Sequence, residues 1–194
     1  KIFAVYPYDG KTQVTIENGK VLTVVASFQN TINEKLLELV KKIIKADEYL
    51  INPAGEWTKG GFDADAGLSG RKLVIDNYGP QISIGGGSFS GKDATKVDRS
   101  GAYMARYVAK NLVAAGYGKE VFVSVAYAIG MVEPLMIEAV NEKGKNLSEI
   151  VRKNFDFSPR NIIKKLDLQK PIFRQTSACG HFGNKNLPWE KIEL

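Results

Sequence analysis

Residues 85–99 combine glycines, cations and carboxylates in one short stretch, which is the chemistry that a metal-bound polyphosphate requires. The three consecutive glycines at its start allow positive φ angles and let backbone N–H groups approach an anion closely. Lys92 and Lys96 supply mobile positive charges, while Asp93 and Asp98 can hold Mg²⁺ or a substrate amine. The stretch therefore predicts a phosphate-binding loop.

The same stretch nearly forms a Walker A sequence, because Gly86 is followed by four residues and then by Gly91 and Lys92. Asp93 stands where a Ser or Thr hydroxyl would contact magnesium. The preceding residues 78–84 contain Gly-Pro and match a buried strand poorly. We therefore disfavour a P-loop, and a solvated glycine-rich loop is the structural alternative.

A second glycine-rich cluster, residues 60–72, repeats this composition and ends in Arg71 and Lys72. An Arg side chain can donate to two phosphate oxygens at once, and a Lys ammonium can neutralise another. An isolated Arg-Lys pair is usually a solvated surface feature. Its likeness to the first cluster favours a second phosphate contact.

Composition restricts the function classes. The 27 Lys and Arg residues are scattered among 21 Asp and Glu residues, for a net charge of +6, without the basic stripe and interleaved aromatics of a nucleic-acid groove. No apolar run is long enough for a membrane span. The single cysteine, Cys179, excludes an internal disulfide and a Cys-based zinc site, and fits a reducing cytoplasm. We expect a small phosphate-bearing ligand, without nucleic acid or membrane.

Periodicity places several elements before the phosphate-binding loop. Alternating apolar residues predict a β-hairpin over 14–25, turning at Asn18-Gly19. Apolar residues at helical spacing predict a helix over 32–45, opened by a capping box of Thr31 and Glu34.

The glycine-rich residues 51–70 indicate a linker, and we expect one α/β unit over 1–60 and another over 61–194. Leu73-Val74-Ile75 predicts a short strand over 72–76. A helix is predicted over 98–115, ended by Gly116, with one face made of Ala102, Ala105, Val108, Ala109, Leu112 and Val113. Further expected elements are strands over 121–129 and 135–140, helices starting at Asn146 or Ser148 and at Ser158-Pro159, and an irregular end over 171–189.

Several strings carry a family resemblance: Gly-Gly-Gly-Ser-Phe-Ser-Gly-Lys-Asp at 85–93, Thr-Lys-Val-Asp-Arg-Ser at 95–100, Gly-Leu-Ser-Gly-Arg-Lys at 67–72, Tyr-Ala-Ile-Gly at 127–130 and Gly-His-Phe-Gly at 180–183. In this order they resemble S-adenosylmethionine synthetase (methionine adenosyltransferase), in its C-terminal portion only. The resemblance implies an α+β fold of sheet-and-helix units, with mixed sheets covered by helices. Residues 1–60 would form a central-type unit, and 61–194 a C-terminal-type unit with the phosphate-binding loop.

The resemblance implies a reaction in which the methionine sulfur displaces triphosphate from C5′ of ATP, followed by cleavage of the triphosphate to phosphate and pyrophosphate. Positioned cations stabilise such a charged leaving group. By similarity, the catalytic residues would be Arg71, Lys92 and Lys96, and the phosphate contacts would be Arg71, Lys72, Ser90 and Lys92. Asp65 and Lys96 would contact methionine, and Asp98 would bind Mg²⁺. Trp57 and Ile129 would contact the nucleoside.

The family's N-terminal domain, with its catalytic histidine, is not matched by this sequence, and we expect His181 to be structural. The resemblance implies Mg²⁺ and K⁺ as cofactors, ATP and methionine as substrates, and a separate chain carrying the N-terminal half in a higher oligomer. A catalytically silent partner that regulates or assembles a complete synthetase is the alternative function. The retained cations favour the enzyme, since a purely structural subunit has no electrostatic reason to concentrate them.

Overall fold

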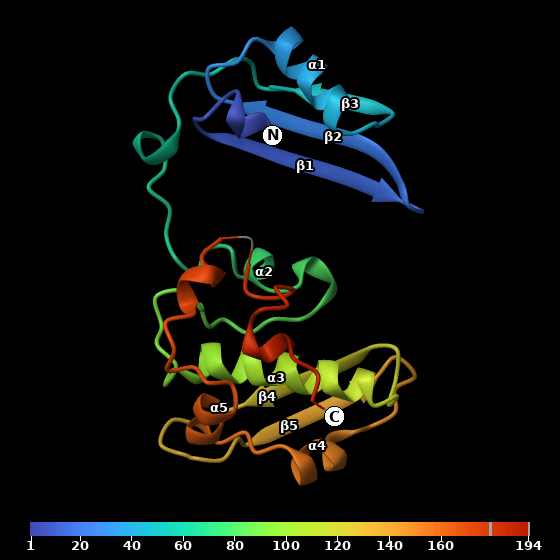
Figure 1. Cartoon of the computed structure of the whole chain (residues 1–194), viewed down its shortest axis with the longest axis vertical. Coiled ribbons are helices and arrows are strands. Elements are labelled where there is room, and N and C mark those ends of the chain that lie inside the picture. The colour runs from blue at the N-terminus through green and yellow to red at the C-terminus, as the bar shows by residue number, and fades with distance from the viewer. Residues whose placement is uncertain (179, 194) are drawn as a thin grey trace. The chain divides into compact units, whose positions relative to one another are not determined.

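A computed structural model describes residues 1–178 and 180–193, so Cys179 and its predicted lack of a disulfide lie outside the described residues. Contacts divide the chain into two units, Lys1–Gly67 and Leu68–Leu194, which are considered one at a time (Figure 1). The boundary falls inside the glycine-rich segment that was predicted to be a linker. No helix in the described part of the chain is long and apolar enough to cross a membrane.

The unit Lys1–Gly67 is built on the predicted hairpin, which is confirmed. Strand β1 (Gly10–Glu17) pairs antiparallel with β2 (Lys20–Phe28), and both turn residues, Asn18 and Gly19, have positive φ angles of 50° and 78°. Strand β3 (Glu48–Ile51) adds parallel to β2 and makes the sheet mixed.

Helix α1 (Asn33–Ile43) connects β2 to β3 and packs on one face of this sheet. Its buried residues Leu36 and Val40 meet the alternating inward residues of β2, namely Val24, Ala26 and Phe28. The predicted helix is thus confirmed, with its ends shifted inward.

The predicted capping box is wrong. The Thr31 hydroxyl donates to the carbonyl of Phe28 at 2.8 Å instead of to the helix, and it accepts from Nδ2 of Asn52 at 2.9 Å. Oε1 of Glu56 accepts from the backbone N–H of Asn33 at 3.2 Å. A carboxylate that is distant in sequence therefore caps the helix, and the local pattern could not indicate this.

In the unit Leu68–Leu194, helix α3 (Val97–Ala114) lies along a two-stranded antiparallel sheet of β4 (Val121–Ala126) and β5 (Met136–Asn141) (Figure 1). Gly116, with φ of 81°, ends α3 as predicted. Helix α4 (Ser148–Asn154) packs on β5, and α5 (Pro159–Lys165) packs on α3. The α+β fold is confirmed.

Helix α3 buries a different face from the predicted one. Val108 and Leu112 are buried as expected, but Ala102, Ala105 and Ala109 are only half-buried, and Val113 is exposed. Large side chains take the core positions, because they bury more apolar area. The buried residues of α3 are Arg99, Ser100, Gly101, Tyr103, Met104, Tyr107, Val108, Asn111 and Leu112.

The strand predicted over 72–76 is wrong, because Leu73–Asp76 forms the short helix α2. No strand in the described residues lies beside this segment, and the exposed fraction of Ile75 is 72%. A short apolar run does not by itself distinguish a strand from a helical turn. The remaining turns are 3₁₀ helices at Ile2–Ala4, Gly61–Asp63, Gly79–Gln81, Phe173–Thr176 and Pro188–Glu190.

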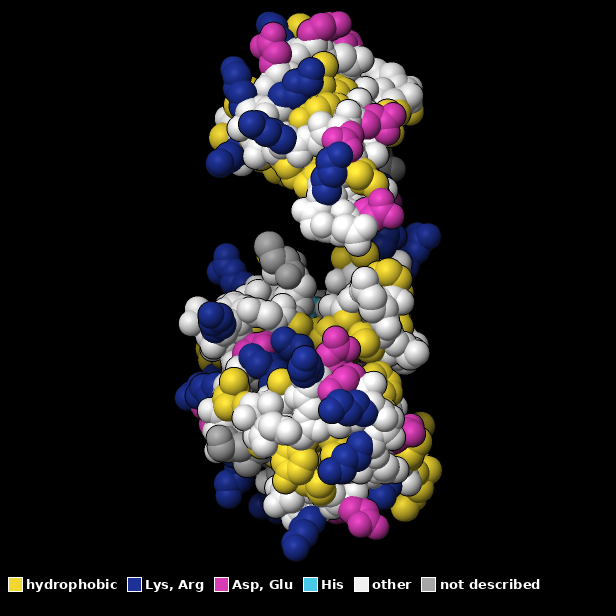
Figure 2. All heavy atoms as spheres, turned by 90° about the vertical axis from the view of Figure 1, so that its right-hand side faces the viewer, with side chains coloured by type: hydrophobic (Ala, Val, Ile, Leu, Met, Phe, Trp, Pro, Cys, Tyr) yellow, Lys and Arg dark blue, Asp and Glu magenta, His cyan; other side chains and the backbone are white. Residues whose placement is uncertain are grey.

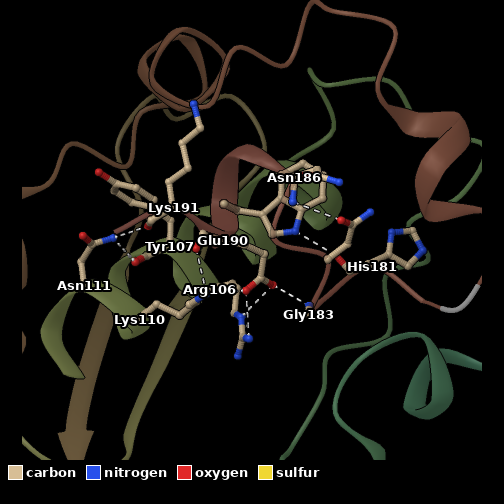
Figure 3. Close-up of polar contacts among 11 residues, drawn as sticks. Arg106, Tyr107, Lys110, Asn111, His181, Gly183, Asn186, Glu190 and Lys191 are labelled. Carbon is tan, nitrogen blue, oxygen red and sulfur yellow. Dashed lines mark hydrogen bonds and ion pairs between the residues drawn. The ribbon is translucent and has the colours of Figure 1, made fainter. Parts of the chain in front are cut away.

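The irregular C-terminal segment is held on α3 by one buried carboxylate (Figure 3). Glu190 accepts from Arg106 through both side-chain oxygens at 3.1 Å, from Nζ of Lys110 at 2.8 Å and from the backbone N–H of Gly183 at 2.7 Å. Burial alone would raise the pKa of Glu190, but these hydrogen bonds and the charge of Arg106 outweigh it and lower the pKa.

Candidate functional site

The first part of the predicted phosphate-binding loop, residues 85–93, forms a turn shortly before α3 begins at Val97. Its turn is closed by a hydrogen bond from the N–H of Lys92 to the carbonyl of Phe89 at 3.1 Å, and Gly91 has a φ of 88°. Nζ of Lys92 lies 2.5 Å from Oδ2 of Asp98 in the first turn of the helix. The structure thus joins a predicted phosphate cation and the predicted metal carboxylate.

Gly87 is needed for space rather than for backbone conformation. None of Gly85, Gly86 and Gly87 has a positive φ, so the conformational reason for a triple glycine was wrong. A Cβ at Gly87 would collide with the Asp98 carboxylate, whereas Cβ atoms at Gly85 and Gly86 would meet open space. Close approach of backbone to carboxylate therefore accounts for one glycine.

The residues do not form a P-loop. The segment before the loop forms a 3₁₀ helix at Gly79–Gln81 where a P-loop would have a strand, and α3 begins at Val97 rather than directly after Lys92. This rules out the Walker A interpretation.

Asp93 is engaged within its own turn. Its Oδ1 accepts from the N–H of Thr95 at 2.8 Å and from the Thr95 hydroxyl, and these hydrogen bonds, the hydroxyl first, lower the pKa of Asp93. Nζ of Lys96 lies 3.7 Å from its other oxygen, and Lys96 is exposed. Nζ of Lys96 also donates to the Thr95 hydroxyl at 3.2 Å, so Lys96 and Asp93 both contact Thr95 in this turn.

Asp98 fits a magnesium site that shares its ligands with a phosphate chain. Mg²⁺ is usually bound by one or two carboxylates plus substrate phosphates and water, and the Asp98 carboxylate is half-exposed beside Gly87. The described residues contain no group of three or more His, Cys, Asp or Glu side chains that could enclose a metal by itself. The use of Mg²⁺ and K⁺ stays a prediction.

The two glycine-rich clusters meet in the structure. The Ser69 hydroxyl donates to the carbonyl of Ser90 at 2.8 Å, and a Cβ at Gly70 would lie 2.9 Å from Cβ of Ser88. Arg71 and Lys72 follow this contact directly, and both are exposed. This contact and a φ of 81° both account for Gly70.

Ile129 lies in the connection between β4 and β5 and is fully exposed. It lines a cavity of about 790 Å³ together with the triple glycine, Asp98 and the half-buried alanines of α3. The predicted phosphate residues Arg71, Lys72, Ser90, Lys92 and Lys96 do not line this cavity. Ile129 and Asp98 thus line the same cavity, and Lys92 is connected to it only through its ion pair with Asp98.

Trp57 and Asp65 belong to the unit Lys1–Gly67. Nε1 of Trp57 donates to the Ser27 hydroxyl at 3.1 Å, on the sheet of its own unit. Oδ1 of Asp65 accepts from the N–H of Gly67 at 2.8 Å and closes a local turn, and the side chain is exposed. Their contacts with adenine and methionine stay predictions.

Sequence reasoning missed that Arg99 lies buried beneath the loop, and it did not place His181 there. Arg99 is buried and donates to the carbonyl of Lys92, and His181 is buried with Nε2 3.5 Å from the Ser90 hydroxyl. The burial of His181 agrees with its expected structural role. The spacing of Arg99 and Tyr103, four residues apart on one helix, was the signal that could have indicated their contact.

Comparison with known proteins decides the family. The family description "S-adenosylmethionine synthetase, C-terminal domain" matches residues 59–191, which is more than half of the chain. The chain belongs to the S-adenosylmethionine synthetase family. This confirms the resemblance of the C-terminal portion.

Curated S-adenosylmethionine synthases align with nearly the whole of this chain. The S-adenosylmethionine synthases of Staphylococcus epidermidis and Desulforudis audaxviator are each 48% identical over 213 residues, which cover 95% of this chain and 53% of the relative. That of Mycoplasma mycoides is 47% identical over 209 residues, covering 95% of this chain and 54% of the relative. The chain spans about half the length of the curated relatives it matches.

Charges on the visible face are mixed. Figure 2 shows Lys and Arg side chains lying among Asp and Glu side chains on the face it presents, without a single basic stripe there.

Proposed function

We propose that this chain is part of a methionine adenosyltransferase that forms S-adenosylmethionine from ATP and methionine, with release of phosphate and pyrophosphate. The observation that carries the proposal is the Lys92–Asp98 pair, 2.5 Å apart on a glycine loop that has no room for a side chain at Gly87. A phosphate-binding cation and a carboxylate suited to magnesium are expected together where a polyphosphate binds.

The chemistry asks this chain to stabilise charge on a leaving triphosphate. Lys92 and Arg71 would bind phosphate oxygens, and the mobile ammonium of Lys96 would approach the reacting groups. Because the triphosphate carries more negative charge after it leaves C5′, these cations stabilise the transition state more than the ground state. Mg²⁺, when held by Asp98 and phosphate oxygens, would supply further charge neutralisation.

A partner segment is the second part of the proposal. Within the described residues β4 pairs only with β5, so its other edge has no strand partner. The cavity of about 790 Å³ beside β4 is lined by the small residues of α3, including Gly101 and Ala105. These features support a site completed by the N-terminal half of the enzyme, on a separate chain in a higher oligomer or as the rest of a longer polypeptide.

The test is reconstitution. The chain is mixed with a separately produced N-terminal half of the Staphylococcus epidermidis relative, and S-adenosylmethionine and phosphate are measured with ATP, methionine, Mg²⁺ and K⁺ present. We expect synthesis in the mixture and none with either half alone. If the halves associate but form no product, the proposal is wrong and the chain is a silent partner.

A further inference from the structure

Arg99 is a buried cation without an acidic partner. The residue is 3% exposed, and none of the ion pairs found among residues 1–178 and 180–193 includes it. Its guanidinium donates to three uncharged oxygens: the carbonyl of Lys92 at 2.6 Å, the Tyr103 hydroxyl at 2.9 Å and the Thr176 hydroxyl at 3.0 Å. In the described residues, every hydrogen bond that the Arg99 side chain donates therefore goes to an uncharged group.

Burying Arg99 without a carboxylate costs free energy, so stability alone does not explain its position. Removing a guanidinium from water is costly, and a buried carboxylate normally compensates it. Here the compensation comes from hydrogen bonds and from the ring of Phe173, whose centroid lies 3.7 Å from Cζ of Arg99. A carboxylate partner would cancel the positive potential of Arg99. Without one, the guanidinium leaves a positive potential that attracts an anion at the loop.

The first turn of α3 holds Lys92 at two points. Arg99 fixes its backbone carbonyl, and the neighbouring Asp98 pairs with its ammonium at 2.5 Å. When a polyphosphate competes for the ammonium, the Asp98 contact can exchange, but the carbonyl contact of Arg99 persists. Arg99 therefore fixes the backbone of Lys92, from which the Lys92 side chain extends.

A second chain of contacts supports the loop at Ser90. The Tyr103 hydroxyl accepts from Arg99 and lies 2.7 Å from Nδ1 of His181, to which it can donate its one proton. With Tyr103 as the donor, a neutral His181 carries its proton on Nε2, which faces the Ser90 hydroxyl at 3.5 Å. Burial, and then the charge of Arg99, lowers the pKa of His181 in agreement with a neutral ring.

We propose that Arg99 is a positioning residue for the phosphate-binding loop, holding the Lys92 backbone from beneath so that the Lys92 ammonium is placed for a polyphosphate ligand. The identity of the ligand rests on the proposed function. The contact itself depends only on the geometry of the loop. The two can therefore be tested separately.

The first measurement is amide hydrogen exchange at residues 89–93 in Arg99→Lys, well below the melting temperature. Lysine keeps the charge but loses the fork of donors, so we expect exchange in the loop to accelerate about tenfold. Arg152→Lys is the matched control, because Arg152 also donates to a backbone carbonyl, that of Ile137 at 2.9 Å, away from the loop. Loop exchange unchanged in Arg99→Lys would overturn the proposal.

The second measurement is calorimetric binding of inorganic tripolyphosphate with Mg²⁺. We expect Arg99→Lys to weaken affinity about tenfold in the parent chain and by less than twofold in a Lys92→Ala background, because the effect acts through Lys92. Equal effects in both backgrounds would contradict positioning. If the parent does not bind tripolyphosphate, the proposed phosphate site fails, and the exchange result still decides the role of Arg99.

Thr176→Val is a milder variant in case Arg99→Lys does not fold. It removes one acceptor that orients the guanidinium, which should loosen the contact of Arg99 with the Lys92 carbonyl. We expect faster exchange in the loop, smaller than in Arg99→Lys. An unchanged loop in a folded Thr176→Val, together with failure of Arg99→Lys to fold, would assign Arg99 a purely structural role and overturn the proposal.

Discussion

Nζ of Lys92 and Oδ2 of Asp98 are 2.5 Å apart, across the turn that joins the glycine loop to helix α3. The two side chains neutralise each other, and both belong to the phosphate site that we propose. A polyphosphate with Mg²⁺ can replace both halves of the pair at once, since it offers oxygens to the cation and a metal to the carboxylate.

Lys92→Ala should lower S-adenosylmethionine synthesis by the reconstituted enzyme about 10²-fold or more, because a cation that stabilises the leaving triphosphate is removed. Turnover at saturating ATP and methionine checks this. Lys164→Ala, at an exposed position of α5, is the control and should leave turnover unchanged. Near-normal turnover in Lys92→Ala would contradict the assigned role.

Arg71→Ala should reduce turnover by a similar factor of about 10²-fold, with no change in melting temperature, since Arg71 is exposed. Arg71→Lys should recover only part of the activity, because lysine cannot donate to two phosphate oxygens in a fork. Arg160→Ala, at an exposed position of α5, is the control. Full activity in Arg71→Lys would show that charge alone suffices.

Glu190→Gln should destabilise the unit Leu68–Leu194 by about 3 kcal/mol, since it leaves Arg106 and Lys110 without their shared carboxylate (Figure 3). Denaturant unfolding measures the change. The lowered pKa of Glu190 means that the carboxylate contributes its stability above the ordinary pKa of 4.5 and loses it as pH falls through the folded-state pKa. Glu149→Gln, at an exposed position of α4, should have little effect.

Stability should also decrease as pH falls below 6.5, the ordinary pKa of histidine, because burial and then Arg99 lower the pKa of His181. The unfolded chain then binds a proton that the folded chain excludes. Asp76 acts in the opposite sense, and the Tyr103 and Ser90 hydroxyls contact the ring. His181→Gln should remove this part of the pH profile, and an unaltered profile would refute the explanation.

Ala105→Trp should weaken association with the N-terminal half about tenfold or more, because it fills part of the cavity beside β4. Analytical ultracentrifugation of the mixture measures the association. Ala114→Trp carries the same substitution at an exposed position at the end of α3 and should leave association intact. Equal affinities in the two variants would remove the cavity from the partner site.

Local sequence determined the features that depend on neighbouring residues. The positive φ angles of Asn18-Gly19 specify the hairpin, and Gly116 ends α3 where it was expected. The composition of residues 85–93 indicated phosphate chemistry, and the order of the motifs indicated the family. The hairpin and the end of α3 are confirmed because each depends on residues close together in the sequence, whereas the phosphate chemistry of residues 85–93 stays a prediction.

Tertiary structure decided the features that depend on distant contacts. The cap of α1 comes from Glu56, the buried face of α3 is set by large residues such as Tyr103, and Leu73–Asp76 is helical without a neighbouring strand. Likewise, Gly87 is required by the nearby carboxylate rather than by its φ angle, and only the folded chain brings Ser69 to Ser90. The amino-acid types thus predicted a phosphate ligand for the loop, whereas packing decided which residues hold the loop in place, because burial brings together groups that the sequence separates.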